Sequence, residues 1–331
     1  MNENDLAPKV IYNLKMMERL CKSSNDVWKM KAYNKAHRTI IFPIYTNQDI
    51  VIYKFGKSIQ QKVSYIIETN KDLQEVVNMD QSQVRVQEDL ASIHAIGNVK
   101  ANDLVHTHNI STIEELRTNL HLLNEKQRIG LKYHDDISKQ IPRAEMIQHD
   151  DMLRSLLTTT FPKVINCAIV GSFRRQKQHS GDIDMIVEIE ECDEKSFMQS
   201  LVDTLIDNRY IPYDGILAKG QKKVMGICTL GYEHPHRRID VLVTNPKEYV
   251  FSVLYFTGNG EFNVKMRKQA KILGYRLNEK GIFMIDTKER VQHGFQHERD
   301  IFTFLGIEYV EPPYREPNFF KLMNNSNNTE K

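Results

Sequence analysis

The chain has 331 residues and a net charge of only +2 at pH 7. This length allows several folded modules, and the balanced charge excludes a protein that is basic throughout. No apolar run approaches a membrane span, no signal peptide is visible and the four cysteines lack metal-site spacing, so we expect an intracellular protein with reduced thiols and no membrane partner.

The first 64 residues carry eleven Lys or Arg and five Asp or Glu, so this segment is basic and the remainder is slightly acidic. Apolar residues follow helical spacing over 10–20 and 59–67, which predicts a helical module over residues 1–80. A basic module ahead of an acidic one suits DNA that is held at two places.

Residues 81–142 are predicted to form a second helical module with a loop at 95–98. This loop and an earlier one at Gly56 resemble helix-hairpin-helix elements, in which a glycine turn aims backbone N–H groups at a DNA phosphate and a monovalent cation (Na⁺ or K⁺) often binds the carbonyls. Such contacts position a duplex without reading its sequence. An ordinary helix–helix turn is the alternative, because Lys54 and Ala95 stand where the motif has its first glycine.

Strands and helices alternate over 143–247, and a smaller mixed α/β piece follows over 248–331. The polar run at 324–328 predicts a disordered tail. The predicted fold class is therefore multidomain α+β: two helical modules, then a mixed β-sheet with helices, then a small α/β C-terminal subdomain.

Two carboxylates carry the strongest chemical signal. Asp182 and Asp184 stand two residues apart in an apolar run that predicts a strand, so their side chains point to the same side. Asp240 lies in a second run of this kind. If the two strands pair, the three carboxylates form a site for two Mg²⁺ ions, since Mg²⁺ prefers oxygen ligands.

A tight turn precedes these carboxylates. A short apolar strand ends at Gly171, which allows the turn, while Ser172 and Arg175 offer a hydroxyl and a planar cation to phosphate oxygens. Either feature alone is usually an ordinary turn or a pair of solvated acids. In combination they predict nucleotidyl transfer from a nucleoside triphosphate.

Several blocks in the same order resemble the X family of DNA polymerases, most closely its beta type. They cover 127–133, 141–143, 171–184, 235–240, 254–258, 262–263, 266–267, 277–279 and 314–317. The resemblance implies a 5′-deoxyribose-phosphate lyase-like domain at 1–80, a helix-hairpin-helix DNA-binding subdomain at 81–142, a catalytic palm at 143–247 and a subdomain at 248–331 that binds the nascent base pair.

The resemblance also implies a role for each site residue. Asp182, Asp184 and Asp240 would hold the two Mg²⁺ ions, with Mn²⁺ as a substitute, and Arg238 would support Asp240. The implied nucleotide-binding residues are Gly171, Ser172, Arg175, Gly181, Tyr255, Phe256, Gly258 and Asn263. The implied DNA-binding residues are Trp28, Lys29, Tyr33, Gly56, Gly97, Arg238 and Arg267. The bond between Gly258 and Asn259 would be cis.

The sequence departs from the family pattern at several positions. Asn259 and Gly260 replace a Ser and an Asp, Val264 replaces a template-stacking Lys, and Leu242 and Gln140 each replace an Arg. These changes predict altered fidelity or closure with the chemistry retained.

A second activity is implied for the N-terminal module. Lys62 falls where the family's beta type has the lysine that forms a Schiff base with an abasic sugar phosphate. Lys29 and Tyr33 would bind the 5′-phosphate, and Trp28 would stack on a base. The alternative is a set of solvated lysines on a basic helix, with Trp28 in the core.

We therefore expect a template-dependent DNA polymerase that fills short gaps in base excision repair, with gapped or nicked DNA and deoxynucleoside triphosphates as substrates. A template-independent nucleotidyltransferase is the first alternative, but the connection at 230–235 is short where such relatives have a long loop. A non-catalytic DNA-binding relative is the second. We expect a monomer that works with DNA ligase and other repair proteins, in the nucleus of a eukaryote or in the cytoplasm or virion of a large DNA virus. Recruitment through an N-terminal phosphopeptide-binding module is not expected.

Overall fold

The computed structural model describes residues 5–190 and 193–315, which form two compact units that meet at His134 and Asp135. The predicted tail at 324–328 lies outside the described residues. Within this part of the chain, no helix is both long and apolar enough to cross a membrane. Four hydrophobic cores each lie almost wholly within one of the four predicted segments, and a smaller cluster of Val170, Ile186 and Val253 joins the last two segments. The exact boundaries of these segments stay a prediction.

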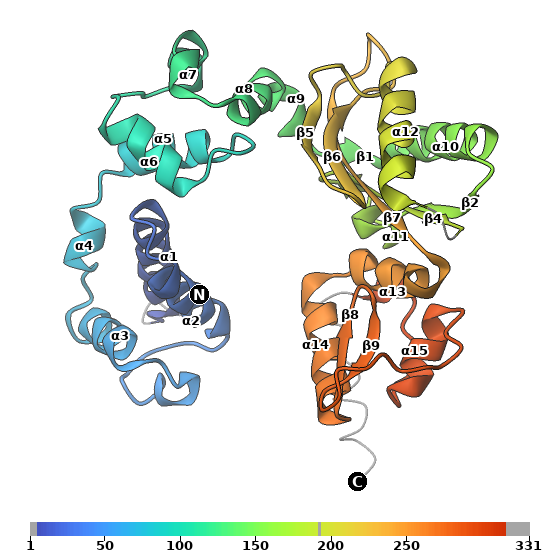
Figure 1. Ribbon diagram of the computed structural model, residues 1–331. Coiled ribbons are helices and arrows are strands. Elements are labelled where there is room, and N and C mark those ends of the chain that lie inside the picture. Colours follow the sequence, from blue (N-terminus) through green and yellow to red (C-terminus); the bar gives the residue numbers. More distant parts are fainter. Residues whose placement is uncertain (1–4, 191–192, 316–331) are drawn as a thin grey trace. The chain divides into compact units, whose positions relative to one another are not determined.

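The N-terminal unit is helical throughout (Figure 1). Its helices are α1 (Ala7–Ser23), α2 (Val27–Thr39), α3 (Lys57–Thr69), α4 (Gln74–Val77), α5 (Gln81–Ala91), α6 (Asn98–His106), α7 (Ile113–Thr118) and α8 (Glu125–Lys132), with short 3₁₀ turns at Val51–Tyr53 and Leu120–Leu122; α9 (His134–Ile137) follows. Val10, Leu14 and Met17 share one face of α1 because of their helical spacing, and they are buried in the first core. Asp26 and Asp80 cap α2 and α5 by accepting backbone N–H groups.

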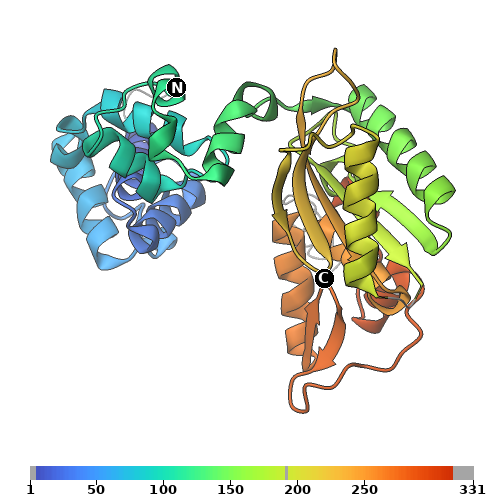
Figure 2. The ribbon, with the colours of Figure 1, turned by 45° about the horizontal axis from the view of Figure 1, so that its top comes forward.

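A five-stranded sheet forms the centre of the second unit (Figure 1, Figure 2). Its strands β2 (Val164–Ile169), β4 (Ile183–Ile189), β7 (Arg237–Thr244), β6 (Lys223–Cys228) and β5 (Ile216–Lys219) lie in this order, and only β4 and β7 run parallel. The helices α10 (Arg143–Thr160) and α12 (Glu194–Asp207) share one core with Ile183, Met185 and Val187 of β4. Because strand side chains alternate, Asp184 and Ile186 face the opposite side of the sheet.

The opposite face of the sheet meets the C-terminal piece. Ile186 packs there against Val253 of α13 (Pro246–Thr257). The remaining elements are α14 (Gly260–Ile272), the hairpin of β8 (Tyr275–Asn278) and β9 (Gly281–Met284), α15 (Glu298–Phe304) and a 3₁₀ turn at Pro312–Tyr314. The second unit also contains a short pair of strands, β1 (Ile141–Pro142) and β3 (His179–Ser180), and the one-turn helix α11 (Gly171–Arg174). The predicted α+β fold class is confirmed.

A buried ionic network ties α11 to the C-terminal piece. Glu298, only 7% exposed, accepts hydrogen bonds from Arg174 at 2.8 and 3.0 Å and from the fully buried Arg315 at 2.8 and 3.2 Å. Burial opposes the charged carboxylate, but the hydrogen bonds from Arg315 and Arg174 outweigh it and lower the pKa of Glu298. The carboxylate therefore stays ionised between two guanidinium groups.

Replacing this carboxylate tests its structural role. Glu298→Gln would leave the fully buried Arg315 and the partly buried Arg174 without their counter-charge, so we expect a loss of about 3 kcal/mol in the free energy of unfolding, measured by urea denaturation. Glu311→Gln is the matched control, because Glu311 pairs with Arg299 at 3.7 Å in an exposed position, where a loss below about 0.5 kcal/mol is expected. Equal losses in the two variants would contradict the network's importance.

Candidate active site

The pairing of β4 with β7 brings the predicted carboxylates together. The two strands are parallel with Asp184 directly opposite Asp240, so the pairing that the sequence analysis left as a condition is present. Asp182 comes immediately before β4, which begins at Ile183, so the strand starts one residue later than expected. Asp182 and Asp184 are still separated by a single residue. The three carboxylates lie close enough for the charges of Asp182 and Asp240 to act on Asp184.

Asp184 is partly buried, as are the other two carboxylates, and its pKa is strongly shifted. Burial, followed by the negative charges of Asp182 and Asp240, raises the pKa of Asp184 to about 7, while Lys223 and Arg238 act in the opposite direction. A carboxyl group with a raised pKa and acidic neighbours is a typical feature of a site that is completed by a cation. The donor set of three carboxylates fits Mg²⁺ or Mn²⁺.

Two basic side chains compensate the outer carboxylates. Arg238 donates a hydrogen bond to Asp182, and the Lys223 ammonium lies 2.6 Å from Oδ2 of Asp240. Among the described residues, no three acidic, His or Cys side chains already stand together as a metal-binding group. The carboxylates would have to release these cations to bind a metal together.

The turn before the carboxylates depends on glycine. Gly171 has a φ of +60°, and a Cβ at this position would lie only 2.7 Å from Oδ2 of Asp184. The backbone N–H of Val170 also donates to the carbonyl of Asp184 at 2.8 Å, which keeps the turn close to β4. Only a glycine satisfies both the backbone angle and the space that Asp184 occupies.

Around this turn lie the side chains expected to hold a triphosphate. The hydroxyls of Ser172 and Ser180 are 2.9 Å apart, and Arg175 donates to the carbonyl of Thr257 at 2.5 Å. Gly181 has open space where a side chain would be. Ser180 was missed in the sequence, because a serine next to a glycine gives no signal until β3 places it beside Ser172.

The expected base-pair and sugar contacts come from one continuous segment, the end of α13 and the start of α14. Tyr255 and Phe256 meet edge to face, and Asn263 donates to the carbonyl of Tyr255 at 2.7 Å. Arg267 donates to the carbonyl of Asn263 at 3.3 Å. The bond between Gly258 and Asn259 is cis, which confirms that prediction.

The N-terminal residues predicted for the second activity differ in exposure and in their partners. Lys62 pairs with Glu75, and Lys29 pairs with Asp26 at 2.8 Å. Trp28 is 82% exposed, so the alternative that places it in the core is wrong. Tyr33 is only 3% exposed, and burial raises the pKa of its hydroxyl to about 12. The predicted contact of Tyr33 with a phosphate stays a prediction, and the buried side chain does not support it.

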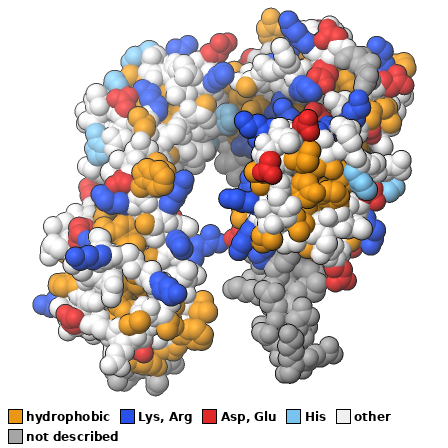
Figure 3. Space-filling view, turned by 60° about the horizontal axis from the view of Figure 1, so that its bottom comes forward, with side chains coloured by type: hydrophobic (Ala, Val, Ile, Leu, Met, Phe, Trp, Pro, Cys, Tyr) orange, Lys and Arg blue, Asp and Glu red, His pale blue; other side chains and the backbone are white. Residues whose placement is uncertain are grey.

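The two glycine loops share an unusual backbone. Lys54 and Ala95 have φ angles of 48° and 66°, the left-handed region that favours glycine. Gly56 and Gly97 then cap α3 and α6, with no atom within 4 Å of where a Cβ would be. Lys54 and Ala95 therefore adopt a conformation that glycine adopts most readily, and the assignment of the helix-hairpin-helix motif stays a prediction. Figure 3 shows basic side chains among exposed hydrophobic side chains on the N-terminal unit.

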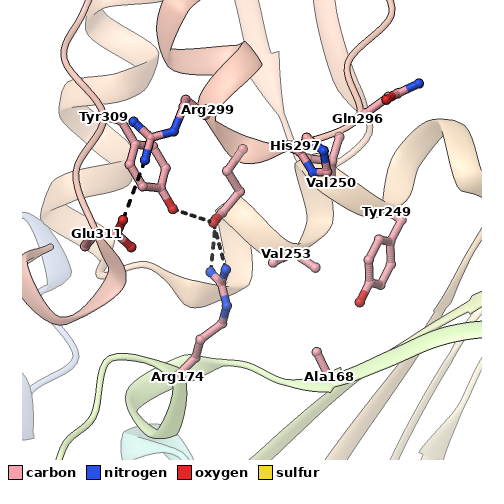
Figure 4. Close-up of a pocket in the computed structure, with 11 residues that line it drawn as sticks. Ala168, Arg174, Tyr249, Val250, Val253, Gln296, His297, Arg299, Tyr309 and Glu311 are labelled. Carbon is pink, nitrogen blue, oxygen red and sulfur yellow. Dashed lines mark hydrogen bonds and ion pairs between the residues drawn. The ribbon is translucent and has the colours of Figure 1, made fainter.

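The cavity in Figure 4 is a separate feature. It has a volume of about 400 Å³, and its lining includes Arg174 from α11, Tyr249 from α13 and His297, Arg299 and Tyr309 from the C-terminal piece. Figure 4 shows Arg174 at this cavity, and its guanidinium donates to the carboxylate of Glu298 at 2.8 Å. None of the three clustered carboxylates lines this cavity, so we do not assign it as the active site.

The raised pKa of Asp184 predicts a pH-dependent stability for the metal-free protein. The folded state holds this proton up to about pH 7, whereas the unfolded chain releases it near pH 4. The stabilisation is therefore fully present below pH 4 and is lost as the pH rises through 7. Asp184→Asn should remove this dependence and stabilise the protein at pH 8 by about 2–4 kcal/mol, measured by urea unfolding in a chelator. The control is Asp207→Asn at the exposed end of α12, and an unchanged pH slope in Asp184→Asn would contradict the assignment.

Three family models match the chain. The DNA polymerase beta palm matches residues 140–246, the DNA polymerase beta thumb matches 252–316, and the fingers domain of DNA polymerase lambda matches 88–138.

Two relatives are DNA polymerase lambda proteins. The one from Rattus norvegicus is 30% identical over 328 residues, covering 92% of this chain and 56% of that protein. The one from Arabidopsis thaliana is 29% identical over 278 residues, covering 78% of this chain and 52% of that protein. The chain thus spans about half the length of these relatives. With fingers, palm and thumb matched in this order along the chain, the chain belongs to the X family of DNA polymerases and is related to the beta type.

Proposed function

We propose that the chain is a template-dependent DNA polymerase that fills short gaps in DNA during base excision repair. The observation that carries the proposal is the register of β4 and β7, which sets Asp184 opposite Asp240, with the glycine turn at Gly171 in contact with Asp184. Its substrates would be deoxynucleoside triphosphates and gapped or nicked DNA. A monovalent cation at the two glycine loops would help to hold the duplex.

Asp182, Asp184 and Asp240 would hold two Mg²⁺ ions, which activate a primer hydroxyl and neutralise charge on the attacked phosphate. Ser172 and Arg175 would bind the triphosphate, since a hydroxyl and a guanidinium both donate to phosphate oxygens. Tyr255 and Phe256 would lie against the incoming sugar, and Asn263 and Arg267 against the base pair.

The connection between β6 and β7 favours templated synthesis. β6 ends at Cys228 and β7 begins at Arg237, so only a short loop joins them. Template-independent members of the family have a long loop at this point. The alternative of a non-catalytic DNA-binding protein is disfavoured because all three carboxylates are present at one edge of the sheet.

Nucleotide insertion tests the proposal directly. We expect insertion opposite the template on a one-nucleotide gapped duplex with a 5′-phosphate in Mg²⁺, and a loss of at least about a thousandfold in Asp240→Asn. Asp207→Asn keeps the same charge change away from the site and should retain activity. Insertion that ignores the template would favour a terminal transferase, and no insertion by the wild type would contradict polymerase function.

We also propose that the N-terminal unit removes 5′-deoxyribose phosphate. The Lys62 amine would attack the sugar aldehyde and form a Schiff base, after which β-elimination releases the DNA 5′-phosphate. The proposal is supported by the position of Lys62, which falls where the beta type of the family has its Schiff-base lysine. Lys62 forms an ion pair with Glu75. Lys62 would have to leave this ion pair and lose its proton to water before the neutral amine attacks.

Borohydride trapping measures the Schiff base. We expect the full chain to crosslink to incised abasic DNA, and Lys62→Ala to lose nearly all crosslinking because the nucleophile is gone. The control is Lys71→Ala, which removes an exposed lysine of the same module and should crosslink as the wild type does. Undiminished trapping in Lys62→Ala would reject Lys62 as the nucleophile.

A further inference from the structure

Lys223 lies next to the proposed metal site but has no part in the chemistry described above. Its ammonium is 2.6 Å from Oδ2 of Asp240, with 40% of the lysine side chain and 16% of the aspartate side chain exposed. β6 and β7 are antiparallel with Met225 opposite Asp240 and Lys223 opposite Leu242. Lys223 is therefore the diagonal neighbour of Asp240 on the same face, within reach of a long side chain.

The neighbours of Lys223 direct its ammonium to this carboxylate. Directly opposite stands Leu242, an apolar side chain that offers no acceptor. Lys222, the residue before it, pairs elsewhere, with Glu194 at 2.7 Å and with Glu248 at 3.4 Å. Two consecutive lysines thus serve separate carboxylates, and only one of them contacts the cluster of three.

A metal ion and this ammonium compete for the same oxygen. Mg²⁺ and Mn²⁺ bind a carboxylate oxygen at about 2.1 Å, which requires direct access to Asp240. An ammonium at hydrogen-bonding distance occupies this side of the oxygen, and its positive charge also repels a divalent cation. Arg238 holds Asp182 in the same way, so two of the three carboxylates carry an internal cation.

We propose that Lys223 is an exchangeable counter-ion of the metal site: it neutralises Asp240 in the metal-free protein and must leave it when the metal binds. Lys223 is thus a positioning residue that sets metal affinity, and it stabilises the carboxylate cluster between catalytic cycles. This inference rests on the proposed metal site and adds the group that the metal displaces.

Metal binding without DNA or nucleotide tests the proposal. The full chain is titrated with Mn²⁺, and free Mn²⁺ is measured by its electron paramagnetic resonance signal. Removing the competing ammonium in Lys223→Met should tighten Mn²⁺ binding about two- to fivefold, the range expected for a partly exposed ion pair. Lys223→Arg restores the charge and should bind Mn²⁺ as the wild type does. Lys222→Met removes the adjacent lysine without touching the cluster and should leave Mn²⁺ affinity unchanged.

Thermal unfolding supplies a second readout that does not depend on activity. Lys223→Met should show a larger Mn²⁺-induced rise in Tm than the wild type, whereas Lys222→Met should show the same rise. Equal or weaker Mn²⁺ affinity in Lys223→Met would overturn the counter-ion role, even if Asp240→Asn abolishes binding and so supports the metal site. An absence of Mn²⁺ binding in the wild type would overturn the metal site and this inference together.

Discussion

The parallel pairing of β4 with β7 is the constraint on which the site depends. Strand side chains alternate, so one register sets Asp184 opposite Asp240, while a slip of one residue would turn Asp240 toward the core under α10 and α12. The register is held by the buried residues between the acids. Ile183 and Ile239 are opposite one another and almost fully buried, which makes a slip costly. Core packing on one face of the sheet thereby fixes the chemistry on the other.

At the start of β7, two consecutive arginines point to opposite faces of the sheet. Arg237 is 4% exposed and donates two hydrogen bonds to Glu145 of α10, at 2.6 and 2.8 Å. Arg238 points to the other side and reaches Asp182. A bidentate pair in the interior thus anchors the strand, while the next side chain is available to the site.

The sequence predicted the acids and their strands because alternation and β-branched residues are local signals. Asp182 and Asp184 were placed on one side by spacing alone, and the cis bond at Gly258 followed from the family resemblance. Lys223 could not be predicted, because its partner depends on the register between β6 and β7, and a lysine in a strand usually points to solvent. Tyr33 was predicted to bind a phosphate together with Lys29 because the two residues are four apart on a helix, but tertiary packing buries the Tyr33 side chain. Local patterns thus identify the residues that carry charge, while their partners depend on contacts between distant segments.

Arg174, the last residue of the one-turn helix α11, and Arg175, which follows it, have different partners. Arg174 donates to Glu298 and to the hydroxyl of Thr257, and Arg175 donates to the carbonyl of Thr257. Successive residues of a helix are rotated by about 100°, so one inserted or deleted residue would redirect both side chains at once. The chain between these anchors is long, and its hairpin turns can change in length without moving either end. Evolution is therefore free to lengthen those loops, but this four-residue turn has almost no tolerance for a change in length.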